Sequence, residues 1–192
     1  MFHAPGRLVV GLAAVVFAYA TVAASAGQAA KPERFTAVAL PPGASGPPTP
    51  VEIVVERWST PAENEKLMTA ITELGTRGML QALLKLPRVG SFAPTGAAGY
   101  PVHYAWKATG PDGIERITLA TERYVSFWEA SNQPPSLDYP ITIIELRIKP
   151  GGSGDGQVAV AAKVDMDRMT KSIIVENYDF QPVLLSAVKR VR

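Results

Sequence analysis

Hydrophobic and polar positions alternate along most of the chain after residue 50, with the two-residue period that is typical of β-strands. In residues 51–59, Val51 and Ile53 share one face and acidic residues occupy the other. Six later segments show the same alternation or a run of β-branched residues. They are residues 100–109, 114–123, 138–149, 157–166, 172–178 and 183–192. The pattern predicts seven strands, and an eighth if residues 34–40, as a short edge strand, or residues 88–92 contribute.

A helical pattern interrupts the strands after the first of them. Thr60 is suited to the N-cap position and Pro61 to the first helical position, and Glu63 completes a capping box with Thr60. An apolar stripe follows at helical spacing, with Gly75 as a stop signal and Thr76 as the expected cap of a second helix. The stripe consists of Leu67, Ile71 and Leu74. The sequence therefore predicts one helical hairpin over about residues 61–86.

Short connections between consecutive strands imply antiparallel neighbours. Six or more strands of this length must curl, and closing the sheet into a barrel removes its exposed edges. We therefore expect a mainly β (α+β) fold: an antiparallel meander of seven to eight strands in a barrel-like or strongly curled sheet. An open sheet wrapped on the helix pair is the alternative. The element order is similar to that of small ligand-carrying barrels, although Trp58 lacks the preceding glycine of the lipocalin G-x-W signature.

The first 26 residues have the pattern of a secretory signal peptide. Arg7 precedes an apolar run, and Ala24-Ser25-Ala26 forms a cleavage site of the A-x-A type. The alternative is an uncleaved anchor, since residues 8–26 approach the span of about 20 residues that a membrane helix needs. We expect cleavage, an exported periplasmic or extracellular protein, and no membrane span in the mature chain.

The expected mature chain has two parts. Residues 27–50 form a lead-in that contains a proline-rich loop or tether, because residues 41–50 include five prolines and two glycines. Residues 51–192 form a single β-rich globular domain.

Composition excludes several classes of protein. The chain has no cysteine, so disulfides, thiol catalysis and cysteine-based zinc sites are excluded. Lys and Arg number 19 and Asp and Glu 17, and the resulting charge of +2 does not suggest nucleic acid as a partner. The sequence also carries no complete metal-binding or nucleotide-binding motif, so we expect neither a metal nor a cofactor.

His103 is the single histidine of the expected mature chain and hence the main candidate for acid–base catalysis. It lies within a predicted strand, away from serine, and no G-x-S-x-G elbow occurs. A hydrolase that uses His103 is therefore a remote alternative to a protein without enzymatic activity.

An aromatic segment at residues 121–139 links two predicted strands, and functional residues tend to gather on such connections. Aromatic rings with a few polar groups can line a ligand pocket, although the same rings are also common core residues. The candidate ligand-binding residues are Trp106, Arg123, Phe127, Trp128 and Tyr139.

Several short phrases of residues 51–188 resemble a family of uncharacterised exported bacterial proteins to which no activity is assigned. These phrases are Glu56-Arg57-Trp58-Ser59, Leu86-Pro87-Arg88-Val89-Gly90, Leu119-Ala120-Thr121-Glu122-Arg123, Ser126-Phe127-Trp128-Glu129-Ala130, Asp138-Tyr139-Pro140 and Glu176-Asn177-Tyr178. The resemblance implies a single exported domain and no particular site residue.

Together these features predict an exported, non-enzymatic β-rich domain that binds a small apolar ligand in the barrel or under the helical hairpin as a lid. The alternative is a structural or protein-interaction module of the cell envelope.

Overall fold

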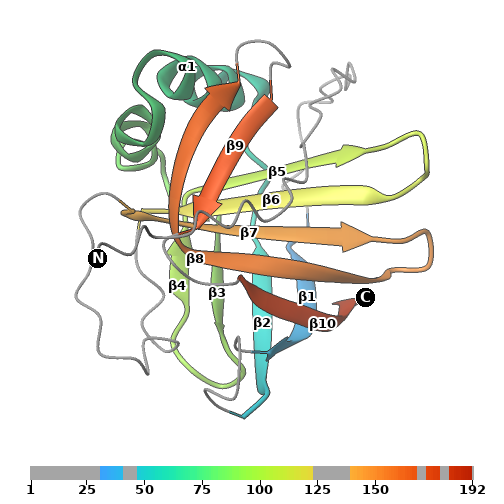
Figure 1. Cartoon of the computed structure of the whole chain (residues 1–192). Helices are drawn as coiled ribbons and strands as arrows, with labels where there is room; N and C mark the ends of the chain where they lie inside the picture. The colour runs from blue at the N-terminus through green and yellow to red at the C-terminus, as the bar shows by residue number, and fades with distance from the viewer. Residues whose placement is uncertain (1–30, 41–46, 123–138, 168–171, 178–181, 192) are drawn as a thin grey trace, which may run out of the picture.

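The computed structural model describes residues 31–40, 47–122, 139–167, 172–177 and 182–191 (Figure 1). Within these residues, ten strands form one antiparallel sheet beside a bent helical element, α1 (Pro61–Leu83). The strands are β1 (Glu33–Leu40), β2 (Thr49–Val55), β3 (Gly90–Pro94), β4 (Tyr100–Val102), β5 (Tyr104–Thr109), β6 (Glu115–Thr121), β7 (Ile141–Ile148), β8 (Ser153–Asp167), β9 (Ser172–Asn177) and β10 (Val183–Val191). The predicted mainly β fold is confirmed.

The sheet consists of two meanders joined by its last strand. Its strand order is β4-β3-β2-β1-β10-β8-β7-β6-β5, and β9 pairs with β8 outside this path. Strands β1–β4 and β5–β8 are each consecutive neighbours, and β10 lies between β1 and β8. The two groups of strands cross each other in Figure 1, and the sheet is curled into a nearly closed barrel.

The first and last strands of this order, β4 and β5, are consecutive in the chain and meet at His103. The backbone N–H of His103 donates to the carbonyl oxygen of Ala120 in β6 at 3.0 Å, and the N–H of Val89 donates to Val102 at 2.7 Å. One short stretch of chain therefore carries the sheet from one meander to the other and brings the barrel near closure.

The strand count differs from the expectation for two reasons. The predicted strand 100–109 divides at His103 into β4 and β5. The segments 34–40 and 88–92, of which one was expected to add an eighth strand, both contribute strands, as β1 and β3. The expectation of a short edge strand at residues 34–40 is wrong, because β1 has β2 on one side and β10 on the other. The sheet thus begins before residue 51, and Phe35 of β1 is part of its core.

Helix α1 has the predicted start and the predicted bend. The hydroxyl of Thr60 accepts from the N–H of Glu63 at 3.2 Å, and the carboxylate of Glu63 accepts from the N–H of Thr60 at 2.8 Å, which completes the capping box. Gly75 leaves helical geometry with φ 56° and ψ −136°, values that favour glycine.

The bend folds the second helical segment back on the first. A Cβ atom added at Gly78 would lie 1.9 Å from the carbonyl oxygen of Ala70, whereas eight residues of straight helix span about 12 Å. This close approach confirms a helical hairpin. Thr76 does not cap the second segment, because its hydroxyl donates to the carbonyl oxygen of Val164 at 3.0 Å and accepts from the N–H of Val164 at 2.8 Å.

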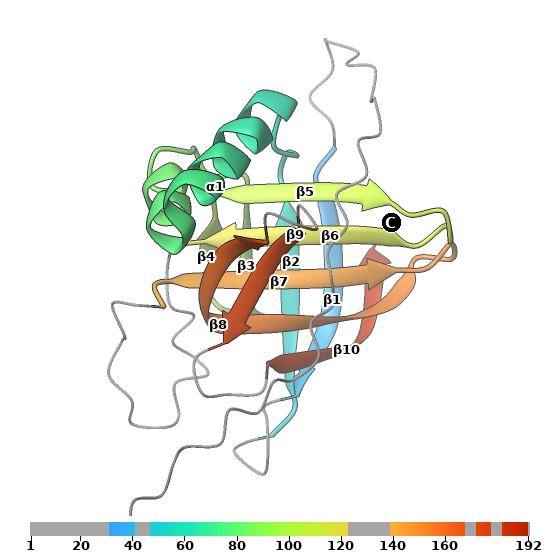
Figure 2. The ribbon, with the colours of Figure 1, turned by 45° about the horizontal axis from the view of Figure 1, so that its top comes forward.

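The buried side chains form two hydrophobic clusters, and adjacent residues of one strand belong to different clusters. Leu119 and Ile144 belong to the cluster inside the barrel, whereas Ala120 and Ile143 belong to a second cluster on the outer face. This second cluster contains the buried side chains of α1, so the helical hairpin packs against the outside of the barrel (Figure 2). Of the predicted helical stripe, Leu67 and Ile71 are buried there, but Leu74 is 55% exposed because the chain turns at the next residue.

The predicted signal peptide, residues 1–26, lies outside the described residues. In the part of the chain that the structure covers, no helix combines the length and apolar character that a membrane span requires.

Candidate functional site

Two of the five predicted ligand-binding residues lie within the described structure. Trp106 of β5 is partly buried and packs against the outer-face cluster beneath α1. Tyr139 is also partly buried, and its hydroxyl donates to a carboxylate oxygen of Glu176 in β9 at 3.0 Å. The remaining predictions, Arg123, Phe127 and Trp128, lie outside the described residues.

The outer-face cluster has a rim of partly buried apolar side chains. We call these side chains the helix-side rim; they are Met68, Leu80 and Ala82 of α1, Leu86 just after it, Trp106 of β5, Met166 of β8, and Ile173 and Val175 of β9. Met166 and Ile173 are cross-strand partners, so they form a continuous apolar surface at the β8–β9 side of the cluster. Methionine and leucine side chains can repack around a guest more easily than the β-branched interior of the barrel.

The barrel interior has a different character. Its inward positions form one contiguous cluster of side chains that are almost completely buried. The large, almost completely buried residues of this cluster include Phe35, Ile53, Phe92, Leu119 and Ile144. Side chains thus fill the inner positions that the structure describes. The outer-face cluster, by contrast, has many partly buried apolar side chains at its edge.

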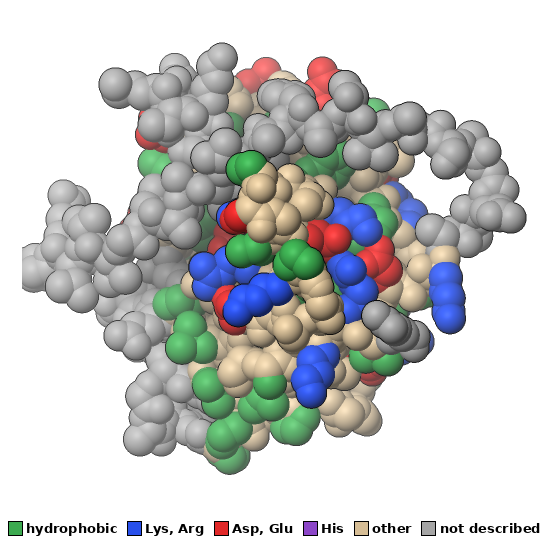
Figure 3. Space-filling view, turned by 90° about the vertical axis from the view of Figure 1, so that its right-hand side faces the viewer, with side chains coloured by type: hydrophobic (Ala, Val, Ile, Leu, Met, Phe, Trp, Pro, Cys, Tyr) green, Lys and Arg blue, Asp and Glu red, His purple; other side chains and the backbone are tan. Residues whose placement is uncertain are grey.

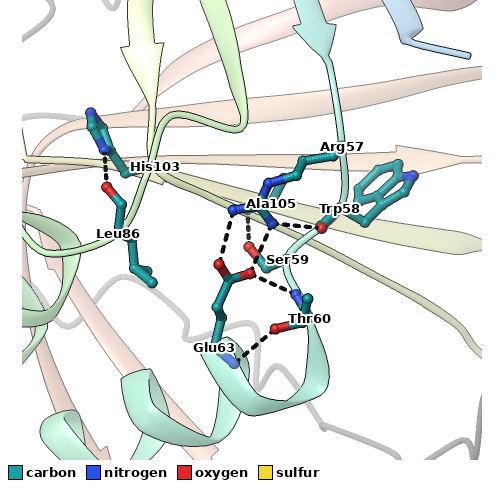
Figure 4. A network of polar contacts seen from close by, with 8 residues as sticks. All are labelled: Arg57, Trp58, Ser59, Thr60, Glu63, Leu86, His103 and Ala105. Carbon is teal, nitrogen blue, oxygen red and sulfur yellow. Dashed lines mark hydrogen bonds and ion pairs between the residues drawn. The ribbon is translucent and has the colours of Figure 1, made fainter. Parts of the chain in front are cut away.

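A polar network ties the start of α1 to the seam where β4 meets β5 (Figure 4). The N–H of Ser59 donates to the carbonyl oxygen of Ala105 at 2.8 Å, and the N–H of Ala105 donates to the Ser59 hydroxyl at 3.0 Å. Arg57 forms two hydrogen bonds of 2.9 Å with the carboxylate of Glu63. The carboxylate that caps the helix is therefore also fixed by the end of β2.

These contacts lower the pKa of Glu63. The hydrogen bonds from the Arg57 guanidinium lower the pKa most, burial opposes them, and the hydrogen bond from the Thr60 backbone adds to the lowering. Because the pKa is lower in the folded state than in the unfolded state, Glu63 stabilises the fold when it is ionised. This contribution is fully present above the ordinary glutamate pKa and is lost as the pH falls through the lowered value.

We therefore expect Glu63→Gln to destabilise the protein by about 1.5–3 kcal/mol at pH 7, the range for hydrogen bonds to a charged group. At a pH below the lowered pKa, the variant and the parent protein will converge in stability, because Glu63 is then uncharged in both states of the parent. Urea unfolding at the two pH values measures this difference. Glu65→Gln is the matched control, since Glu65 is exposed on the same helical turn. A constant difference between Glu63→Gln and the parent at both pH values would contradict the prediction.

His103 lies at the seam with both ring nitrogens near acceptors. Its Nδ1 atom is 2.8 Å from the carbonyl oxygen of Leu86, and its Nε2 atom is 3.5 Å from a carboxylate oxygen of Glu122. Both ring nitrogens therefore face contacts at the seam, and neither is directed at a serine hydroxyl among the described residues. The described contacts of His103 thus favour a role in barrel closure over the hydrolase alternative.

A second group of charged side chains lies around Trp58, which follows the end of β2. A carboxylate oxygen of Glu33 accepts from the indole N–H of Trp58 at 2.9 Å and from Nζ of Lys107 at 2.7 Å. Arg190 pairs with Glu33 and Glu115. Burial tends to raise the pKa of Glu33, but the hydrogen bonds from Lys107 and Trp58 outweigh it and lower the pKa. The sequence does not predict this charged cluster, because its residues lie far apart along the chain and no local motif connects them.

No group of three or more potential metal ligands occurs in the part of the chain that the structure describes. Comparison of the chain with models of protein families, with curated proteins and with solved structures gives no match. The resemblance to a family of exported proteins stays a prediction.

Proposed function

We propose that this protein is an exported, periplasmic or extracellular, non-enzymatic binding module that holds a small apolar ligand at the helix-side rim. The observation that carries the proposal is the contrast between the two clusters. The barrel interior has few partly buried apolar neighbours, whereas the cluster beneath α1 has many, including two methionines and a predicted site residue, Trp106. An apolar guest that contacts these side chains would remove their remaining exposed surface from water.

The position of α1 supports such a site. The hairpin is fastened to the barrel by its capping network at Ser59 and Glu63 and by the contact of Thr76 with Val164. Side chains between these attachments can adjust while the backbone of the hairpin keeps its place. A ligand at the helix-side rim would contact side chains of both the helical hairpin and the sheet.

Two measurements test the proposal. Mass spectrometry of extracts from protein purified from the exported fraction should detect a bound apolar small molecule. Titration of ligand-free protein with 1-anilinonaphthalene-8-sulfonate should show saturable binding, and Trp106→Ala should weaken it about tenfold or more, as expected from loss of an aromatic contact of about 1.5 kcal/mol or more.

Leu184→Ala is the matched control, because Leu184 is an exposed leucine of β10 outside the helix-side rim. The proposal is wrong if the protein binds neither a co-purified molecule nor the probe, or if Trp106→Ala and Leu184→Ala bind the probe as the parent does.

The alternative, a protein-interaction module of the cell envelope, is favoured by a different observation. Leu74 and Leu84 of the helical region are 55% and 63% exposed. Exposed leucines of this kind can contribute to an interface when they lie in a larger apolar patch. A self-association that is lost in the Leu74→Ser, Leu84→Ser double variant would support this alternative.

A further inference from the structure

A polar pocket of about 320 Å³ lies at the end of the barrel where the tips of two hairpins meet. Its walls come from the β5–β6 hairpin, including Thr109 and Glu115, and from the β7–β8 hairpin, including Lys149 and Gly152. Arg190 of β10 completes the lining. Figure 3 faces this end of the molecule, where Lys and Arg side chains gather among a few acidic ones. We call this space the hairpin-tip pocket.

Several contacts fix the guanidinium of Arg190 in the pocket. Its Nη2 atom pairs with the carboxylate of Glu115, and its Nε atom lies 3.4 Å from a carboxylate oxygen of Glu33. The guanidinium carbon is 5.3 Å from the centre of the Phe35 ring, within the range of a cation–π contact. The backbone N–H of Arg190 donates to the carbonyl oxygen of Gly152 at 2.8 Å. A guanidinium held by contacts from two strands, β1 and β6, loses little further freedom when it binds a ligand.

The other polar groups give the pocket an excess of hydrogen-bond donors. Lys149 is exposed at the wall and has no ion-pair partner among the described residues. The hydroxyl of Thr109 supplies a further donor. Of the charged side chains in the lining, two are cationic and one, Glu115, is anionic and paired with Arg190. Glu33 also pairs with Arg190 but has Lys107 as a second partner, so these three cations and two carboxylates keep one positive charge. The local charge therefore favours an anion.

We propose that the hairpin-tip pocket binds a small oxyanion, the carboxylate or phosphate group of a polar ligand, between Lys149 and Arg190. Charge-assisted hydrogen bonds from Lys149 and Arg190 hold the anionic oxygens, and the Thr109 hydroxyl orients the group. The volume is at the small end of the range for ligand pockets, which suits a single sugar acid or phosphorylated fragment. This site does not depend on the apolar site at the helix-side rim.

Titration of the whole mature protein with inorganic phosphate and, separately, with D-glucuronate tests the proposal by NMR. Saturable shifts of the amide signals of Gly151, Gly152 and Thr109 are expected for at least one of the two anions. Lys149→Gln should weaken that binding about tenfold or more, the effect of one charge-assisted hydrogen bond. Binding of phosphate alone assigns a phosphate group, and binding of glucuronate alone assigns a carboxylate.

Two variants keep the test specific. Lys163→Gln removes the same charge from an exposed position of β8 that does not line the pocket, and it should bind like the parent. Thr109→Val keeps the size of the side chain and should weaken binding to a smaller degree than Lys149→Gln. The proposal is overturned if neither anion shifts the signals of the pocket, or if Lys149→Gln and Lys163→Gln weaken binding equally.

Discussion

Replacing Phe35 with alanine will destabilise the fold by about 3–5 kcal/mol, the usual cost of removing a buried aromatic ring from a core. Phe35 is fully buried in the barrel interior and lies on β1, between β2 and β10. Its ring also lies beneath the guanidinium of Arg190, so the variant loses a cation–π contact together with the packed ring. Denaturant unfolding followed by circular dichroism measures the change.

Thr36→Ala is the control for this prediction, because Thr36 is the next residue on β1 and its side chain is exposed. Its effect should stay within about 0.5 kcal/mol, as for most surface substitutions. If Phe35→Ala were as mild as Thr36→Ala, β1 would be a dispensable attachment to a domain that starts near residue 51.

Replacing Leu67 with alanine should cost about 2–5 kcal/mol of global stability. Leu67 is 1% exposed and packs α1 against the outer face of the barrel. If the helical hairpin is a permanent part of the folded domain, a cavity there weakens the whole structure, and all spectroscopic probes should report one shifted transition. Unfolding followed by far-ultraviolet circular dichroism and by tryptophan fluorescence provides the two probes.

Leu74→Ala removes the same atoms from the same helix at a position that is 55% exposed, and we expect it to change stability by less than about 1 kcal/mol. Separate transitions for the helix and the barrel in Leu67→Ala would show instead that the hairpin detaches as a lid. The comparison therefore decides whether α1 is part of the cooperative unit.

Local signals in the sequence predicted the local structure well. The residues of the capping box, Thr60 and Glu63, make the two hydrogen bonds that their spacing predicts, and the chain bends at Gly75. Both features depend on interactions within a few residues, which is the range that a sequence pattern reports directly.

The division of residues 100–109 into two strands was not predictable in this way. Val102, Tyr104 and Trp106 alternate with other residues in the sequence and so predict one apolar face. In the structure Val102 lies inside the barrel, whereas Tyr104 and Trp106 pack on its outer face. The phase changes at His103, where the chain changes partners from β3 to β6. Such a change follows from the closure of the sheet, which the two-residue period does not report.

The residues of the candidate sites are also only partly predictable, because local patterns do not report contacts between distant parts of the chain. Trp106 is a candidate because of its aromatic ring, and it lies at the helix-side rim. No local pattern predicts that Met68 and Met166 pack against the same cluster, because each belongs to an element distant in sequence. The hairpin-tip pocket was missed for the same reason. Arg190 and Glu115 become partners only after β10 has inserted between β1 and β8. Residues 150–156 at that pocket are rich in glycine, and this local pattern predicts a turn between two strands.

The pairing of β1 with β10 has a consequence for the order of folding. Arg34 lies opposite Val191, so the first strand of the sheet finds its second neighbour only when the last strand is present. A chain that is synthesised from its N-terminus therefore cannot complete the barrel until nearly all of it has emerged, and contacts of such long sequence separation slow the search. The pairing of β1 with β10 also makes the protein suitable for circular permutation. Joining residues 33 and 191 by a short linker and opening the chain at the β5–β6 turn would preserve every strand pairing.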